Sequence, residues 1–236
     1  MSTVAWITAR GLFGRRRVLL LLPLPLLLVG LALLCRSYDV DPAEWGEPVL
    51  VGLGLAVVLP VISLIVGTGV LGSEVDDGTI VHILTKPLPR RDIILAKLGV
   101  AIGVTTLTTV IPLFVAGTLA FTVKFGLALA VGAVVGSIAY STFFLLLSLI
   151  TRRPVLLGLV YILVWEGLLA RFVSGTRVLS IEQYVIAIAD RIDPSPVLPA
   201  NVSIPVSIVM SVVIAVGCTI YAVDRLRSFS MAGETS

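Results

Sequence analysis

The chain has 236 residues, of which 58% are hydrophobic and 13% are charged, whereas an ordinary soluble domain carries about 25% charged residues. With a mean hydropathy of +1.11, this composition predicts an integral membrane protein and excludes a disordered chain. Two cysteines exclude a disulfide scaffold. The chain has no G-x-x-x-x-G-K-[ST] sequence, which excludes a self-contained ATP-driven pump.

Six apolar runs are candidates for membrane-spanning helices, each of which needs about 20 residues. They predict an all-α, polytopic membrane protein whose residues 1–236 form a single membrane domain. The runs cover residues 18–34, 49–71, 93–121, 125–150, 154–170 and 203–223. Lys97 lies near the start of the long third run, so we expect either that this helix tilts or that the lysine reaches back to the interface.

The distribution of basic residues predicts the orientation. With the N-terminus inside, twelve of the 17 Lys and Arg residues fall on the cytoplasmic side. This asymmetry predicts a multi-pass protein of the cell (plasma) membrane with both termini in the cytoplasm. The same basic residues account for the net charge of +3 without nucleic acid as a partner.

Two segments next to the first span have simple interpretations. Residues 1–17 combine Trp6 with a basic triplet at 15–17, which favours an interfacial helix on the cytoplasmic surface over a frayed tail. The acidic loop 36–48 is predicted to be a solvated loop. A cation site is the alternative, although the loop has no coordinating pattern.

The segment 72–92 is the most informative connection between spans. Ser73 followed by Asp76 resembles a capping box, and acidic residues suit a first helical turn. Apolar residues then recur at helical spacing before a basic residue and two prolines end the pattern: Ile80, Ile83, Leu84, Lys86, Pro87 and Pro89. The prediction is a short amphipathic helix on the cytoplasmic face, whose apolar side packs either on another protein or on its own bundle.

The segment 171–202 is too long for a simple connection. Its apolar residues form one helical stripe, made of Val178, Ile181, Val185, Ile188 and Ile192. Ser180 and Gln183 are candidate caps, and Asp193-Pro194 ends the helix. We expect an amphipathic helix that lies on the outer surface, either as a lid on the bundle or as a gate of an exit path.

Glu166 is the one acid well inside a predicted span, and such residues are candidates for function. Its place near the outer end of the fifth run suggests either a role in a pathway or an ion pair with Arg171 or Arg36. The single histidine, His82, lies outside the spans, so neither a metal centre nor an intramembrane serine protease is expected. We therefore predict no catalytic, metal or cofactor-binding residue in this chain.

Small residues recur at helix-packing spacing in two spans, as Gly99–Gly103 and Gly132–Gly136. This G-x-x-x-G spacing lets helices approach closely. The sequence leaves open whether the partner helix belongs to the same chain or to a second copy.

A set of residues around the second connection resembles the permease subunits of type 2 ATP-binding-cassette (ABC) transporters. The set comprises Gly72-Ser73-Glu74, Gly78-Thr79-Ile80, Lys86-Pro87, Arg90 and Lys97. The predicted layout is also similar: an N-terminal surface helix, six spans, and a helical element before the last span.

This resemblance implies a half-transporter that carries no enzymatic activity. A second copy or a related permease would complete the membrane unit, each half would bind a separate cytoplasmic ATPase, and ATP and Mg would reside on that partner. Spans one, two and five would line the dimer interface and the path of an exporter. The implied coupling residues are Glu74, Asp76, Asp77, Gly78, Thr79, Ile80, Ile83, Leu84, Lys86, Pro87 and Arg90. The alternative is a membrane scaffold or regulatory protein without transport activity.

Overall fold

The computed structural model describes residues 21–76 and 90–231, and the side chains of 21–70, 91–173 and 175–226. The described chain is helical throughout and contains no strand. Its elements are α2 (Pro23–Ser37), α3 (Pro42–Gly46), η2 (Glu47–Val58), α4 (Leu59–Asp76), α6 (Arg90–Ala120), α7 (Val123–Ile150), α8 (Pro154–Val160), η3 (Tyr161–Leu169), α9 (Ala170–Phe172), η4 (Ser174–Leu179), α10 (Ile181–Ile192) and α11 (Ile204–Met231).

Five helical stretches of the described chain are long and apolar enough to cross a membrane. They are Pro42–Val70, Arg91–Ala120, Val123–Ile150, Pro154–Phe172 and Ile204–Leu226. Each overlaps one of the predicted runs from the second to the sixth, and only the second differs by more than a few residues, since it begins at Pro42 and not at 49. The first run is represented by α2, an apolar helix of 15 residues that is shorter than a full span, and residues 18–20 of the prediction lie outside the described part.

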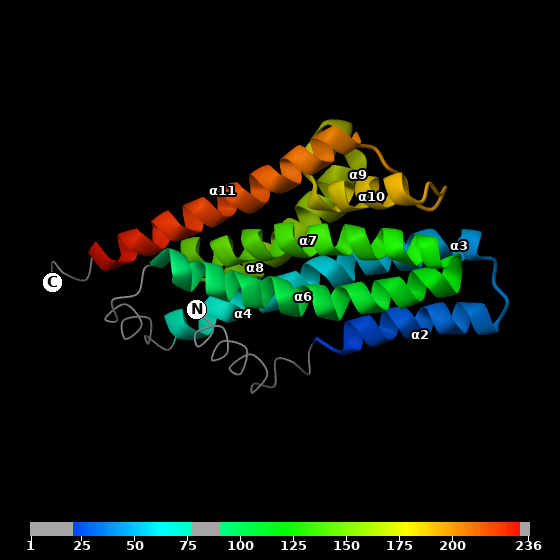
Figure 1. The fold of residues 1–236 in the computed structure, drawn as a ribbon, viewed down its shortest axis with the longest axis horizontal. Coiled ribbons are helices and arrows are strands. Elements are labelled where there is room, and N and C mark those ends of the chain that lie inside the picture. The colour runs from blue at the N-terminus through cyan, green and yellow to red at the C-terminus, as the bar shows by residue number, and fades with distance from the viewer. Residues whose placement is uncertain (1–20, 77–89, 232–236) are drawn as a thin grey trace.

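The helices form one elongated bundle with two distinct ends (Figure 1). One end, here called the α10 end, carries the connections at residues 38–41, 121–122 and 193–203. The opposite end carries the end of α4, the start of α6 and the turn from α7 to α8. Helix α7 is central, because α4, α6, α10 and α11 all pack against it.

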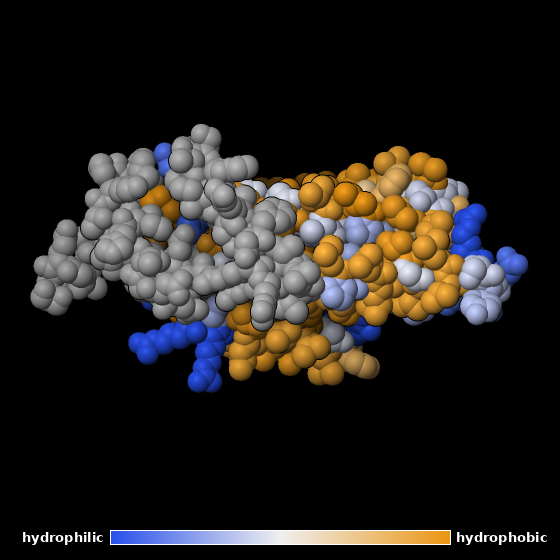
Figure 2. All heavy atoms as spheres, turned by 90° about the horizontal axis from the view of Figure 1, so that it is seen from below, coloured by the Kyte–Doolittle hydropathy of each residue, from blue (hydrophilic) through white to orange (hydrophobic). Residues whose placement is uncertain are grey.

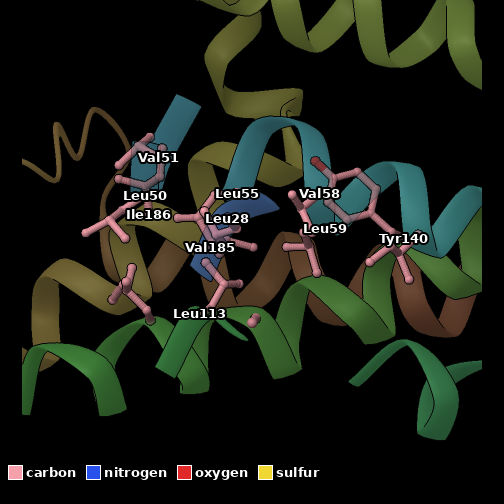
Figure 3. Close-up of a cluster of buried hydrophobic side chains, with 14 of the residues drawn as sticks. Leu28, Leu50, Val51, Leu55, Val58, Leu59, Leu113, Tyr140, Val185 and Ile186 are labelled. Carbon is pink, nitrogen blue, oxygen red and sulfur yellow. The ribbon is translucent and has the colours of Figure 1, made fainter. Parts of the chain in front are cut away.

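The main apolar core lies where α2, η2, α4, α6, α7 and α10 meet (Figure 3). Leu28, Leu55, Leu59 and Val185 are fully buried in it. Each burial contributes roughly 1.5–3 kcal/mol in water, but in lipid close van der Waals packing has to replace most of that driving force. The visible surface is accordingly apolar along its middle and hydrophilic residues gather toward its ends (Figure 2).

The second and fifth spans contain π-helical segments, η2 and η3. At their ends the Leu59 amide donates to the Gly54 carbonyl and the Ala170 amide to the Trp165 carbonyl, five residues back in each case. Such widened turns are rare and frequently lie at functional sites. Segment η2 borders the pocket described below, and η3 contains Glu166.

The sequence predicts that a new helix starts at Ser73, but the structure has no helix start there. Helix α4 continues without a break through Asp76, so Ser73 and Glu74 belong to its last turn and Ser73 is not an N-cap. The capping-box prediction was wrong here because a helix that is already formed extends at little cost, and Gly72 is too weak a breaker to stop it.

Lys97 also differs from one of its two predicted positions. Its side chain is only 1% exposed, and its Nζ donates a 3.0 Å hydrogen bond to the Val70 carbonyl of α4. The ammonium group therefore does not reach back to the interface. It links α6 to α4 inside the bundle. A buried ammonium group is costly unless it is hydrogen-bonded, and the Val70 carbonyl supplies an acceptor.

Candidate functional site

Glu166 lies in η3 and is 1% exposed. One carboxylate oxygen, Oε1, accepts from the Tyr161 hydroxyl at 2.7 Å and from the Ile181 amide at 3.1 Å. The other, Oε2, accepts from the Ser180 hydroxyl at 2.8 Å and from the Glu182 amide at 3.2 Å. All four positions around the carboxylate face donors, so its negative charge is solvated by the protein itself.

This network joins the fifth span to the first turn of α10. The first amides of a helix have no partner within the helix and carry a partial positive charge. Glu166 accepts from two of them, while the Ser180 hydroxyl acts as the N-cap and accepts from the Gln183 amide at 3.3 Å. The first three amides of α10, those of Ile181, Glu182 and Gln183, therefore all have acceptors. This allows the N-terminus of the helix to be buried.

The predicted ion pair of Glu166 with Arg36 or Arg171 is not present. The Arg36 guanidinium instead donates to the Leu119 carbonyl at 2.9 Å, near the end of α6. Glu166 takes hydroxyl and amide donors because the chain folds back after α9 and brings Ser180 and the following amides to the carboxylate. The cap role of Ser180 was predicted correctly, whereas the Gln183 side chain accepts from Asn201 and does not complete a capping box.

Helix α10 begins and ends close to the predicted positions, but it does not lie on the surface. Residues 181–187 are all buried, and the helix packs against α7, α11 and η2. Gly132 and Gly136 of α7 allow this approach, since an added Cβ at Gly136 would lie 2.8 Å from the Val185 Cγ2 atom. The Gly132–Gly136 motif thus serves packing within the chain, whereas Gly99 and Gly103 face open space.

Other polar groups surround the Glu166 network. The Tyr184 hydroxyl donates to the Val178 carbonyl. The buried Tyr140 hydroxyl of α7 has no hydrogen-bond partner among the described residues, although it lies within electrostatic range of Glu166 and Glu182. The region around Glu166 therefore holds several polar side chains inside the bundle.

A pocket of about 390 Å³ opens between η2, the end of the fifth span, α10 and the loop before α11. Its polar lining comprises Glu47, Arg171, Arg177, Glu182, Gln183 and Asn201. Its apolar lining includes Val51 and Ile186. The sequence pointed to three of the polar residues, each in another role: Arg171 as an ion-pair partner, Gln183 as a cap, and Glu47 as part of the acidic loop 36–48.

The charged residues of this pocket differ in their partners. Each guanidinium nitrogen of Arg177 donates one hydrogen bond, and the acceptors are the Ala170 and Arg171 carbonyls and the Asn201 side chain. Glu182 is 4% exposed. Burial, with a smaller contribution from the nearby Glu166, raises the pKa of the Glu182 carboxyl to about 8, against a lowering effect of Arg171.

The coupling residues implied by the resemblance fall on a segment that is mostly outside the described residues. Glu74 and Asp76 lie in the last turn of α4, and Arg90 is the first residue of α6. Residues 77–89, which hold Asp77 through Pro87, lie outside, as does the predicted interfacial helix at 1–17. Within the described ranges, no group of three or more His, Cys, Asp or Glu side chains is placed to hold a metal ion.

The fold defines a class: a polytopic, all-helical membrane protein with at least five helices long enough to span the bilayer. A family model described as "ABC-2 family transporter protein" matches residues 15–176. The match covers more than half of the chain, and the chain belongs to the ABC-2 family. It is thus a membrane transport subunit, not itself catalytic, of a kind that works with an ABC ATPase. A comparison with curated proteins gave no match.

Proposed function

We propose that this chain is the permease subunit of an ATP-driven exporter in the cell membrane, with both termini in the cytoplasm. Two permease halves, identical or related, form the translocation path, and each half binds a separate cytoplasmic ATPase that carries ATP and Mg. The observation that carries the proposal is family membership over residues 15–176, joined to the Glu74, Gly78-Thr79-Ile80 and Lys86-Pro87 pattern between the second and third spans.

The coupling residues of this proposal are Glu74 to Arg90. The ends of α4 and α6 flank them at one end of the bundle. Lys97 links these two helices close to that end through its bond to Val70. A push on the connecting segment would therefore reach the second and third spans together, since packed helices transmit displacement as rigid elements.

The test is a pull-down in mild detergent from native membranes, followed by mass spectrometry and a vanadate-sensitive ATPase assay. We expect a stoichiometric P-loop ATPase to co-elute. The double variant Asp76→Lys/Asp77→Lys is expected to lower ATPase association and activity while the protein still inserts. Glu44→Lys is the matched control, because Glu44 is an exposed acid at the α10 end.

Two outcomes contradict the proposal. Normal ATPase association and unchanged transport in the double variant would show that the segment is not the coupling site. Recovery of the chain without any P-loop ATPase would instead favour a membrane scaffold or regulatory role.

A further inference from the structure

The pocket between η2, α9 and α10 contains an acidic and a basic side chain, Glu182 and Arg171, that do not engage each other. The Glu182 carboxyl group accepts no hydrogen bond from any described residue, although Glu182 is only 4% exposed. The exposed Arg171 guanidinium makes no hydrogen bond or ion pair within the described chain. Arg171 still acts on the Glu182 carboxyl through space, so the two charges lie near each other but more than 4.0 Å apart.

A buried carboxyl without a partner is costly, because leaving water is not offset by a hydrogen bond. Glu166, which accepts from the Glu182 backbone amide, is by contrast a buried acid with four hydrogen bonds. Glu182 faces the pocket instead. Its unused oxygens are therefore available to a donor that enters the pocket.

The chemistry of the lining narrows the ligand class. The charged lining residues whose side chains make no hydrogen bond within the described part of the chain are two acids, Glu47 and Glu182, and one base, Arg171. A metal ion is poorly matched, since no cluster of three ligands exists among the described residues. A simple anion would meet two carboxylates. A simple cation would meet Arg171, whereas a ligand with an ammonium group and an anionic group bridges both charges.

We propose that this pocket binds a zwitterion of the phosphoethanolamine type, with the ammonium group on Glu182 and the phosphate on Arg171. Its volume of about 390 Å³ lies within the range of small-molecule sites. The apolar side chains of Val51 and Ile186 line the same pocket and suit the carbon atoms that join the charged groups to the rest of the ligand.

In the permease proposed above, this pocket borders the second and fifth spans, the two spans expected to line the path. That placement rests on the proposed function, but the binding itself requires neither ATP nor a partner ATPase. A failed binding experiment would leave the permease assignment untouched, and absence of an ATPase would leave the binding result readable.

The test is isothermal titration calorimetry on the full chain purified in maltoside detergent. The main probe is dihexanoyl-phosphatidylethanolamine, and O-phosphoethanolamine is the headgroup without acyl chains. We expect saturable binding of the main probe. Dihexanoyl-phosphatidylglycerol, which lacks the ammonium group, should bind at least tenfold more weakly.

Two variants test the assigned contacts. Glu182→Gln and Arg171→Gln are each expected to weaken binding by at least tenfold, since each removes one charge-assisted contact. Glu44→Gln and Arg152→Gln carry the same changes at exposed positions outside the pocket and should bind as the unchanged protein does. Thermal unfolding of each variant shows that it is folded. Equal binding to folded Glu182→Gln would overturn the proposal.

The pH dependence gives a second, independent readout. Glu182 must be ionised to receive the ammonium group, and Glu166, Arg171, Tyr140, Glu47 and Arg177 are the titratable or charged groups that face it or share its pocket. Affinity should therefore rise up to about tenfold per pH unit from pH 6 toward 8 and then level off. The control variant Arg152→Gln should show the same rise of affinity with pH. An affinity that does not change with pH in this variant would contradict the assignment of Glu182.

The two probes also distinguish the source of the ligand. Binding of the short-chain lipid alone indicates a lipid headgroup, whereas equal binding of O-phosphoethanolamine indicates a soluble zwitterion. Both results support the shared chemistry, and binding of neither probe overturns it.

Discussion

Replacing Glu166 should release the first turn of α10 from the fifth span. In Glu166→Ala, two buried amides and two hydroxyls lose the acceptor that they share. The hydroxyls can rotate toward other acceptors, but the amides of Ile181 and Glu182 cannot. With about 1–3 kcal/mol for each of the two unsatisfied amides, we expect a total loss of roughly 2–6 kcal/mol, since the Ser180 cap of the Gln183 amide remains in place.

The variant Glu166→Gln refines this reasoning. The carboxamide keeps one acceptor oxygen, but its NH₂ group replaces the other. In either orientation that NH₂ group faces a backbone amide, since each carboxylate oxygen now accepts from one of them. We therefore expect an intermediate loss of stability, smaller than in Glu166→Ala although the side-chain volume is almost unchanged.

The assay is thermal unfolding in detergent, followed by size-exclusion chromatography, together with hydrogen–deuterium exchange of residues 181–192. Glu166→Ala should unfold roughly 10 °C or more below the unchanged protein, with faster exchange in α10. Glu44→Ala, an exposed acid in α3, is the control. Equal unfolding temperatures and equal α10 exchange in Glu166→Ala and Glu44→Ala would refute the role of the carboxylate.

Three further predictions follow from single contacts. Gly136→Val should lower the free energy of unfolding by about 1–3 kcal/mol, because the larger side chain overpacks against Val185. The control Gly103→Val adds its side chain in open space and should have the unfolding temperature of the unchanged protein. Equal unfolding temperatures of the two variants would contradict the close packing at Gly136. Lys97→Met should speed amide exchange at the end of α4, measured by mass spectrometry, because it removes the bond to Val70; unchanged exchange would exclude that link. Glu182→Gln should raise the unfolding temperature at pH 8.5 and not at pH 4. A carboxyl whose folded pKa is about 8, above its ordinary value, favours the fold most at low pH and loses that contribution as the pH rises through 8; the same gain at both pH values would contradict this.

The helices were largely predictable from the chain alone. Five apolar runs correspond to five helices with shifts of a few residues, except at the second, which begins at Pro42. Length and hydropathy suffice here because a chain in lipid must satisfy every backbone group within its own helix. Ser180 and Asp193 also bounded α10 correctly, since a cap is a local interaction.

The polar contacts of the site were not predictable in the same way. Glu166 stood out as an intramembrane acid, but three of its four partners follow 14 to 16 residues later, beyond η4. Glu182 looked like an ordinary acid in the first turn of a helix, and nothing local marks it as buried. Its surroundings come from η2 and from the loop before α11, which are far away in the sequence.

The sequence by itself determined that the chain is a helical membrane protein, where most of its spans lie, and which family it resembles, because these depend on composition and on local patterns. Only the tertiary structure decided that α10 is inserted beside α7, that Glu166 accepts from its first two amides, and that Glu182 and Arg171 line one pocket. Those features depend on how the chain turns back after Phe172 and on the glycines that let α10 approach, and no local pattern specifies the direction of such a turn.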